Sequence, residues 1–331
     1  MIVQSPYNGK PMRVVYEDDT WVFRGEKYPY VHIAFYDEES GERFTTTQSD
    51  TVCFEQVGNQ YRAKYGVPYT DEIIALRKRY GVSAAKMSAI LGFGVNQYRL
   101  YEMGEIPSES NGKMIRAAMN PEVFMDLVQG MRHNLSGREY ERMSSNIRQE
   151  IAKGRVCLDE QLPANRLFLS RRGPENGFAP RSTSRLRNLL LHILGQMGCI
   201  EAAKLDSVLF YIDFVSYREC GMAISGLAYN AIEIGPVPQR WDRVYSAFDE
   251  IVPKPQLVNE QESVVLTSNI EADMDAFSQK EMGVVGTVCE KLKDLSLHAI
   301  SEMSRMEPAW KKYLNRPGTI PYSEAFCLVG M

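Results

Sequence analysis

The stretch VSAAKMSAILGFGVNQYRLYEMGEIP, residues 82–107, is the most informative part of this chain. Its apolar residues recur with a period near 3.6, which predicts a short helix over 84–91 and a second over 95–101. Between them lies Gly92-Phe93-Gly94, where residues without a Cβ atom can adopt the positive φ that a reversal of the chain requires. We therefore predict two short helices joined by a tight turn.

A further helix is predicted immediately upstream, over 71–80. Thr70 is its expected N-cap, and Gly81 can end it in the left-handed conformation. The same spacing gives the inner faces of the three helices. The apolar residues expected to share one core are Ile73, Ile74, Leu76, Met87, Ile90, Leu91, Tyr98 and Tyr101.

Two short helices with such a turn form the helix-turn-helix pattern, whose second helix can enter the major groove of DNA. Asparagine and glutamine can bond adenine in bidentate fashion, and arginine can bond guanine or phosphate. The candidate DNA-binding residues are Val95, Asn96, Gln97, Arg99 and Leu100. The alternative is a solvated polar face on a helix that only packs or dimerises. Residues 71–116 hold seven basic and five acidic side chains, and this weak charge favours the alternative.

The residues that follow the second helix carry a family resemblance. Tyr101-Glu102-Met103-Gly104-Glu105, then Pro107-Ser108, resembles the "WE.G...PS" signature of the Xre/Cro family, with Tyr101 in the place of the usual tryptophan. The resemblance covers roughly residues 68–125. It implies a five-helix-type domain that binds operator DNA, placed here at 68–131. Modest affinity per copy, with homodimerisation supplying the rest, would fit the weak charge.

Composition narrows the class of protein. The 331 residues are 44% hydrophobic and 24% charged, as in ordinary soluble proteins, and should hold two or three domains. The net charge of −4 gives no global basic field. No apolar run approaches ~18 residues and the N-terminus lacks the apolar segment of a signal peptide, so we expect a cytoplasmic protein without a membrane partner. The six cysteines and four histidines are scattered, so we expect no metal and no cofactor.

Residues 1–55 are predicted to form a small β unit. Three segments, 12–16, 20–23 and 30–36, are rich in β-branched and aromatic residues and are separated by turn residues. The unit holds five basic and ten acidic side chains. An acidic surface of this kind should not itself lie on DNA.

Two turns of this unit resemble the zinc ribbon of MqsA-like antitoxins, whose frames read CPxCG and CxxCGE. The corresponding segments here are Ser5-Pro6-Tyr7-Asn8-Gly9 and Asp37-Glu38-Glu39-Ser40-Gly41-Glu42. Hydroxyl and amide groups are poor zinc ligands beside thiolate. The resemblance implies a degenerate zinc-ribbon-like unit that keeps the turns and has lost the metal. The positions where thiolates would stand are Ser5, Asn8, Asp37 and Ser40.

The C-terminal half is predicted to be helical with a small β-sheet, after a helical spacer and linker over 132–182. Gly235-Pro236-Val237-Pro238 is expected to be a rigid turn, because each proline fixes φ. Strands are predicted over 225–234 and 263–266. Helices are predicted over 186–197, 202–217, 240–248, 280–292, 296–304 and 308–314.

A series of short motifs follows in order along this half: Lys204-Leu205, Leu209-Phe210-Tyr211, Ile224-Ser225-Gly226-Leu227, Tyr229 to Pro238, Leu295-Ser296 and Glu307-Pro308-Ala309-Trp310. With these motifs the half resembles the Panacea domain of SocA-type antitoxins over about 183–331. The resemblance implies a domain that binds and neutralises a cognate protein toxin. Each motif also has a structural alternative: the GPVP segment as a shape element, and Tyr211, Tyr217, Tyr229 and Trp310 as core residues.

Catalytic motifs are absent from the sequence: it holds no GxSxG, P-loop, HExxH or GxGxxG. Asp206 and Asp213, seven apart on one predicted helix, are expected to be solvated or capping rather than an acid–base couple. A basic cluster near the domain boundary is expected to be solvated or to meet an acidic toxin surface, and a second contact with nucleic acid is the alternative. Its arginines are those at 166, 171, 172, 181, 185 and 187.

We therefore expect a mainly helical α+β protein that is not an enzyme, with the domains 1–55, 68–131, 132–182 and 183–331. The predicted function is that of an antitoxin of a type II toxin–antitoxin system. Its partners would be a protein toxin encoded next door and operator DNA. One alternative is a transcription regulator with a sensory or partner-binding C-terminal domain and no toxin. Another is a helix-turn-helix that is vestigial for DNA and supports toxin binding or dimerisation.

Overall fold

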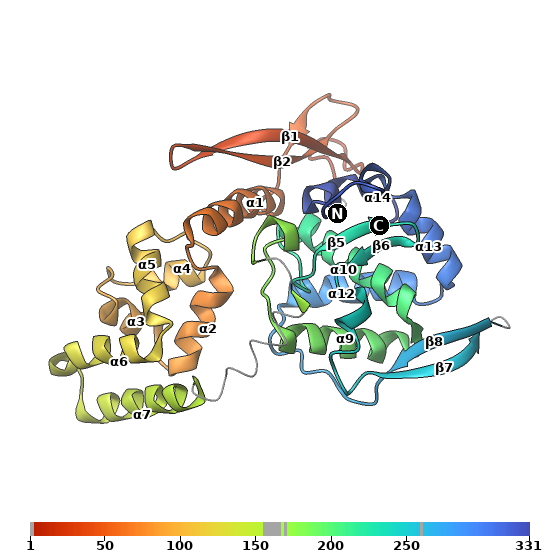
Figure 1. Cartoon of the computed structure of the whole chain (residues 1–331). Helices are drawn as coiled ribbons and strands as arrows, with labels where there is room; N and C mark the ends of the chain where they lie inside the picture. Colours follow the sequence, from red (N-terminus) through yellow and green to blue (C-terminus); the bar gives the residue numbers. More distant parts are fainter. Residues whose placement is uncertain (1–2, 155–166, 169–170, 259–260) are drawn as a thin grey trace. The chain divides into compact units, whose positions relative to one another are not determined.

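The computed structural model describes residues 3–154, 167–168, 171–258 and 261–331. The fold is mainly helical with small antiparallel sheets, as the sequence predicts (Figure 1). The chain forms two compact units. One consists of residues 58–162, and the other joins residues 1–57 with residues 163–331.

The N-terminal sheet is built on a long hairpin. Strands β1 (Arg13–Phe23) and β2 (Glu26–Tyr36) pair antiparallel along their full length, and β3 (Arg43–Phe44) pairs with the end of β2. The prediction of two separate strands over 12–16 and 20–23 was wrong. The acidic residues between them continue β1, because that part of the strand faces solvent at the edge of the sheet.

Helix α1 (Thr47–Tyr65) begins inside residues 1–55, which were predicted to form only a small β unit, and it continues beyond them. Its polar residues hide the helical period because several of them are buried and hydrogen-bonded. Gln56 donates to and accepts from the backbone of Val31 in β2, each over 2.9 Å. Arg62, 1% exposed, donates to Asn59 Oδ1 over 3.1 Å.

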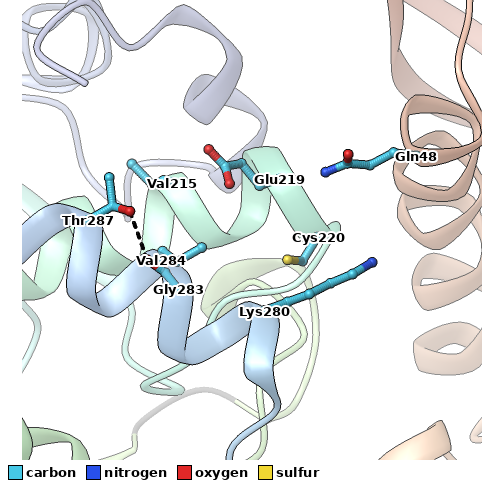
Figure 2. Close-up of a pocket in the computed structure, with 8 residues that line it drawn as sticks. All are labelled: Gln48, Val215, Glu219, Cys220, Lys280, Gly283, Val284 and Thr287. Carbon is cyan, nitrogen blue, oxygen red and sulfur yellow. Dashed lines mark hydrogen bonds between the residues drawn. The ribbon is translucent and has the colours of Figure 1, made fainter. Parts of the chain in front are cut away.

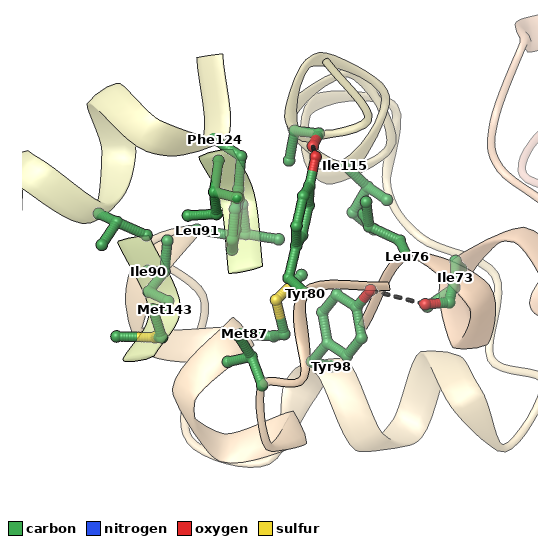
Figure 3. Close-up of a cluster of buried hydrophobic side chains, with 14 of the residues drawn as sticks. Ile73, Leu76, Tyr80, Met87, Ile90, Leu91, Tyr98, Ile115, Phe124 and Met143 are labelled. Carbon is green, nitrogen blue, oxygen red and sulfur yellow. Dashed lines mark hydrogen bonds between the residues drawn. The ribbon is translucent and has the colours of Figure 1, made fainter. Parts of the chain in front are cut away.

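Residues 58–162 form a helical unit around one apolar cluster, drawn in Figure 3. All the core residues predicted for the three central helices are buried except Ile74, which is half-buried. The last helix supplies Met143 and Ile147 to the same cluster. The helices are α2 (Thr70–Tyr80), α3 (Ala84–Ile90), α4 (Gln97–Glu102), α5 (Glu109–Ala118), α6 (Pro121–Gly130), the 3₁₀ helix η1 (Arg132–Asn134) and α7 (Gly137–Gly154).

The C-terminal part of the other unit is arranged around α10 (Ala202–Cys220), which is buried from Lys204 to Tyr217. It packs against α12, α13, β6 and η3. The remaining helices are η2 (Pro174–Asn176), α9 (Thr183–Met197), α11 (Trp241–Val244), α12 (Gln279–Leu292), α13 (Leu297–Met306), α14 (Pro308–Tyr313) and η3 (Tyr322–Cys327). The helix predicted over 240–248 is therefore reduced to one turn.

Two small sheets complete this unit. Strand β8 (Gln261–Thr267) lies between β4 (Ile200–Glu201) and β7 (Val252–Val258), and β5 (Tyr229–Ile232) pairs with β6 (Gly235–Pro238). The rigid turn predicted for the GPVP segment was wrong, since that segment is β6 itself. Its prolines are tolerated because the sheet has only two strands, so one edge of β6 needs no N–H donor.

Candidate functional site

The predicted pair of short helices is present as α3 and α4, with one difference at the turn. Helix α4 begins at Gln97, so Val95 and Asn96 precede it rather than forming its first turn. Gly92 has the positive φ that was expected, 71°, and the second positive φ falls on Asn96, at 66°, rather than on Gly94. Asparagine is one of the few side chains that tolerate this conformation.

Buried tyrosines fix the rotation of α4 about its axis (Figure 3). Tyr98 is fully buried, and its hydroxyl donates to the carbonyl of Ile73 in α2 over 2.8 Å. Its N–H donates to Ser88 Oγ in α3 over 3.0 Å. Burial raises the pKa of Tyr98 well above its usual value. One turn later, Tyr101 accepts a hydrogen bond from Asn111 Nδ2 over 2.7 Å. Contacts of its buried side with α2, α3 and α5 therefore fix which face of α4 points outward.

That outward face carries the residues proposed from the sequence. Val95 is 91% exposed and Leu100 43% exposed, and Asn96 and Arg99 are also exposed. Arg99 forms no ion pair with the described residues of the chain. Gln97 is half-buried, and its amide donates to Glu105 Oε1 over 3.0 Å. Four of the five side chains are thus free for a partner, and Gln97 is partly engaged.

The charge around α4 is shaped by ion pairs. Glu102, on α4 itself, is 2.6 Å from Arg77 Nε, so its negative charge is compensated. Glu72 pairs with Arg116 across 3.0 Å. The pair with Arg77 compensates acidic charge on α4 that would oppose a polyanion, and Arg99 keeps its cationic group in solvent, while Glu105 beside Gln97 retains its carboxylate.

In the other unit, buried polar side chains of the sequence motifs form hydrogen bonds between distant parts of the chain, and we call these bonds cross-links. Lys204, 8% exposed, donates to the carbonyls of Lys293 and Leu295 over 3.0 and 2.7 Å, at the end of α12. Burial lowers the pKa of Lys204. The first and fifth motifs therefore contact each other, which their separation in sequence could not reveal.

A second cross-link is centred on Asp213, which is fully buried. Its carboxylate accepts from the N–H groups of Ile224 and Ser225, each over 2.8 Å, from Tyr229 OH over 2.6 Å, and from the Ser225 hydroxyl. Burial raises the pKa of Asp213, and these donors oppose that rise. The expectation of a solvated or capping Asp213 was wrong, because its partners come from the loop after α10.

A third cross-link joins the Glu307 motif to the end of the chain. Glu307 is fully buried and accepts from Tyr211 OH over 3.0 Å and from the N–H groups of Val329 and Gly330 over 2.9 and 2.8 Å. Tyr211, Tyr217 and Tyr229 are all buried, as the structural alternative predicted. Trp310 is half-buried, and its indole N–H donates to the carbonyl of Ile232 over 2.7 Å.

Asp206 differs from these groups because one of its carboxylate oxygens lacks a partner. It is 2% exposed, and its Oδ1 makes no hydrogen bond with the described residues. Burial raises the pKa of Asp206 to about 8. The expectation of a solvated or capping Asp206 was wrong.

Four arginines of the cluster at the predicted domain boundary have partners within the unit. Arg185 pairs with Glu281 across 2.6 Å, and Arg187 pairs with Glu250 across 2.7 Å. Arg171 is exposed, and position 166 lies outside the described residues. Backbone carbonyls accept hydrogen bonds from Arg172 and Arg181.

A pocket of about 230 Å³ lies beside the end of α10 (Figure 2). Its lining includes Glu219, Cys220 and Lys280. Burial and the neighbouring Glu219 raise the pKa of the Cys220 thiol to about 11. The thiolate is the reactive form of cysteine, so this thiol is a weak nucleophile near neutral pH.

Two kinds of feature are absent from the residues that the structure describes. No helix in that part of the chain is both long and apolar enough to span a membrane. No group of His, Cys, Asp and Glu side chains in the same part is arranged to hold a metal ion.

Comparison with known proteins gives one match. Residues 207–311 match the family model described as "Antitoxin SocA-like, Panacea domain". This segment runs from α10 to α14 and includes Asp213, Ser225 and Glu307. Neither the comparison with curated proteins nor that with solved structures gave a significant match. The matched segment is therefore similar to an antitoxin domain, and the N-terminal part of the chain lies outside the match.

Proposed function

We propose that this protein is the antitoxin of a type II toxin–antitoxin pair. The match of residues 207–311 to an antitoxin-like family model carries the proposal. In this proposal the C-terminal part of the chain, residues 183–331, binds a protein toxin encoded by the adjacent gene and neutralises it by direct contact. Binding energy at such an interface concentrates in a few anchor side chains, so single substitutions there should have large effects.

The second part of the proposal is autoregulation. A homodimer binds operator DNA through α3 and α4, with Val95, Asn96, Arg99 and Leu100 directed at the groove and Gln97 beside them. Three observations support this part. The face of α4 is exposed, the helix is held by Tyr98, and the charge of Glu102 is compensated by Arg77.

The toxin arm is tested by co-expressing the full chain with its neighbouring gene. We expect the neighbour to arrest growth alone, to be harmless with this protein and to co-purify with it. A neighbour that is harmless alone, or that forms no complex, would overturn the antitoxin function. The regulator with a sensory or partner-binding C-terminal domain would then be the better description.

The DNA arm is tested by the full-length variant Asn96→Gly/Gln97→Ala/Arg99→Ala, in which glycine removes the Asn96 side chain and keeps its φ of 66° without strain. Each lost base contact is worth roughly 1–3 kcal/mol, so operator affinity at fixed salt should fall by on the order of 100-fold or more. A matched control replaces the same residue types at exposed positions on η1 and α7, as Asn134→Ala/Gln149→Ala/Arg148→Ala. The control should bind operator normally, and both variants should still neutralise the toxin.

If the triple variant on α4 binds operator as tightly as the unmodified chain, the DNA role of α4 is wrong. Unchanged neutralisation in the same strain would then favour a helix-turn-helix that is vestigial for DNA. The two arms thus fail separately, because toxin rescue and operator binding are measured on the same full-length variants.

A further inference from the structure

Two turns of the N-terminal sheet, residues 5–10 and 37–42, have the same backbone geometry. In each, the N–H of the fifth residue donates to the carbonyl of the first, over 3.0 Å in the first turn and 2.9 Å in the second. In each, the N–H of the first residue donates to the carbonyl of the sixth, over 2.8 and 3.0 Å. The fifth residues, Gly9 and Gly41, have φ angles of 67° and 73°. We call these the first and second turn.

The side chains at the first and fourth positions of each turn are also equivalent. Each accepts a hydrogen bond from the backbone N–H two residues later, over 3.2, 2.8, 2.9 and 3.3 Å. A turn of this kind aims two side-chain atoms to one side and supports each with a backbone donor, as outer-shell groups support metal ligands. The four positions are Ser5, Asn8, Asp37 and Ser40.

The residues now at these positions do not fit a zinc ion. A tetrahedral structural site needs thiolate or imidazole ligands, and the four side chains offer two hydroxyls, an amide and one carboxylate. Ser5 Oγ also donates directly to Asp37 Oδ2, so the two turns contact each other at positions that a metal ion would bridge. We derive no metal chemistry from this site.

Direct side-chain hydrogen bonds link the turns instead, and all of them run in the same direction. Every donor belongs to the first turn and every acceptor is a carboxylate of the second. Asn8 donates to Glu39 over 2.7 Å, and Tyr7 donates to Glu42 over 2.8 Å. The other two bonds run from Ser5 to Asp37 and from Lys10 to Glu39.

We propose that these four hydrogen bonds form a clasp that holds the two turns together in place of a metal ion. The backbone of the two turns is still shaped for tetrahedral metal binding. Two consequences follow. The N-terminal sheet of this protein is independent of zinc, and four cysteines placed at the four positions would restore a zinc site. The proposal does not depend on the antitoxin function.

The test compares three full-length proteins: the unmodified chain, the variant S5C/N8C/D37C/S40C, and the control S5A/N8A/D37A/S40A. After incubation with zinc and gel filtration, the cysteine variant should retain one more metal equivalent per chain than either other protein. With cobalt it should develop the absorption of tetrahedral thiolate coordination. A cysteine variant that is folded by circular dichroism and retains no extra metal would overturn the retained metal-site geometry.

Hydrogen exchange of the natural protein keeps the proposal testable if the cysteine variant does not fold. A chelator should leave the protection of amides in 5–10 and 37–42 unchanged, whereas S5A/K10A should raise their exchange rates. The matched control is the exposed pair Ser110→Ala/Lys113→Ala in the other unit. Chelator-sensitive protection in the unmodified protein, or S5A/K10A exchange equal to that of the control, would overturn the clasp.

Discussion

Asp213 is the residue on which the loop after α10 depends. It is fully buried and accepts four hydrogen bonds from that loop and from Tyr229. Asp213→Ala leaves these donors without a partner, which should lower the free energy of unfolding by about 3–5 kcal/mol. Urea denaturation followed by far-UV circular dichroism measures this change. The exposed Asp249→Ala is the control and should change stability by less than about 0.5 kcal/mol; a similar loss in both variants would refute the role given to Asp213.

Asp206 provides a pH test because burial raises its pKa from 3.8 to about 8. The folded protein holds this proton at pH values where the unfolded chain has lost it. Stability from this group is therefore present at low pH and is lost as pH rises from about 4 to 8. Asp206→Asn removes the titration, so its melting temperature relative to the unmodified protein should rise between pH 5 and pH 8. Parallel pH profiles for the two proteins would contradict the raised pKa.

Sequence reasoning reached these two aspartates but not their environments. Their spacing on one helix was correct, since both lie on α10. What spacing cannot give is the partner, because Ser225 and Tyr229 reach Asp213 from beyond the end of the helix. Lys204 and Glu307 were likewise identified only as members of sequence motifs, and their hydrogen-bond partners could not be predicted from the sequence.

At the scale of the element, helix α2 ends at Gly81 as the sequence predicted, and Gly81 has a φ of 63°. A Cβ atom there would lie 2.9 Å from Asn146 Nδ2 of α7. Gly81→Ala should therefore destabilise the unit of residues 58–162 by roughly 1–2 kcal/mol, the usual cost of the left-handed conformation. Thermal unfolding measures it.

Gly130 at the end of α6 is the matched control for this substitution. Its backbone φ is not positive, and a Cβ atom would meet nothing within 4 Å. Gly130→Ala should be neutral or should stabilise by up to about 1 kcal/mol. Equal destabilisation by the two alanines would mean that helix ends in general, and not the conformation of Gly81, set the cost.

Which elements were predictable depended on where their polar residues lie. Helices α3 and α4 are amphipathic, so the period of 3.6 placed α3 within a residue and only the start of α4 was misplaced. The cap of α2 was misplaced as well: Tyr69, whose N–H donates to Glu72 over 2.8 Å, precedes the helix that Thr70 begins. Helix α1 was missed because Gln56 and Arg62 are buried, which breaks the rule linking polarity to exposure.

At the scale of the whole molecule, one unit is built from a continuous segment of the chain and the other from its two ends. The apolar cluster of residues 58–162 is formed, among the described residues, by side chains between positions 73 and 151. By contrast, Tyr16 of β1 packs on Phe326 with ring centroids 5.3 Å apart, so residues 163–331 share a unit with the N-terminal sheet. Local sequence patterns do not report a contact between two ends of a chain, so these ends were predicted as separate domains.

This difference predicts how fragments behave. A fragment of residues 47–154, which keeps α1 whole, should unfold cooperatively, and Gly81→Ala should lower its melting temperature as in the full chain. A fragment of residues 163–331 should show poor dispersion in its amide NMR spectrum, because it lacks the sheet that covers Phe326. A well-dispersed spectrum from the second fragment would show that residues 1–57 are dispensable for that core.

The clasp between the first and second turn has a consequence for the living cell. When zinc is scarce, a protein held together by a zinc ion loses the ion and unfolds. In the proposed clasp, the two turns are joined by the protein's own serine, asparagine, tyrosine and lysine side chains, bound to carboxylates. We therefore expect the N-terminal sheet to keep its fold in a cell that runs short of zinc.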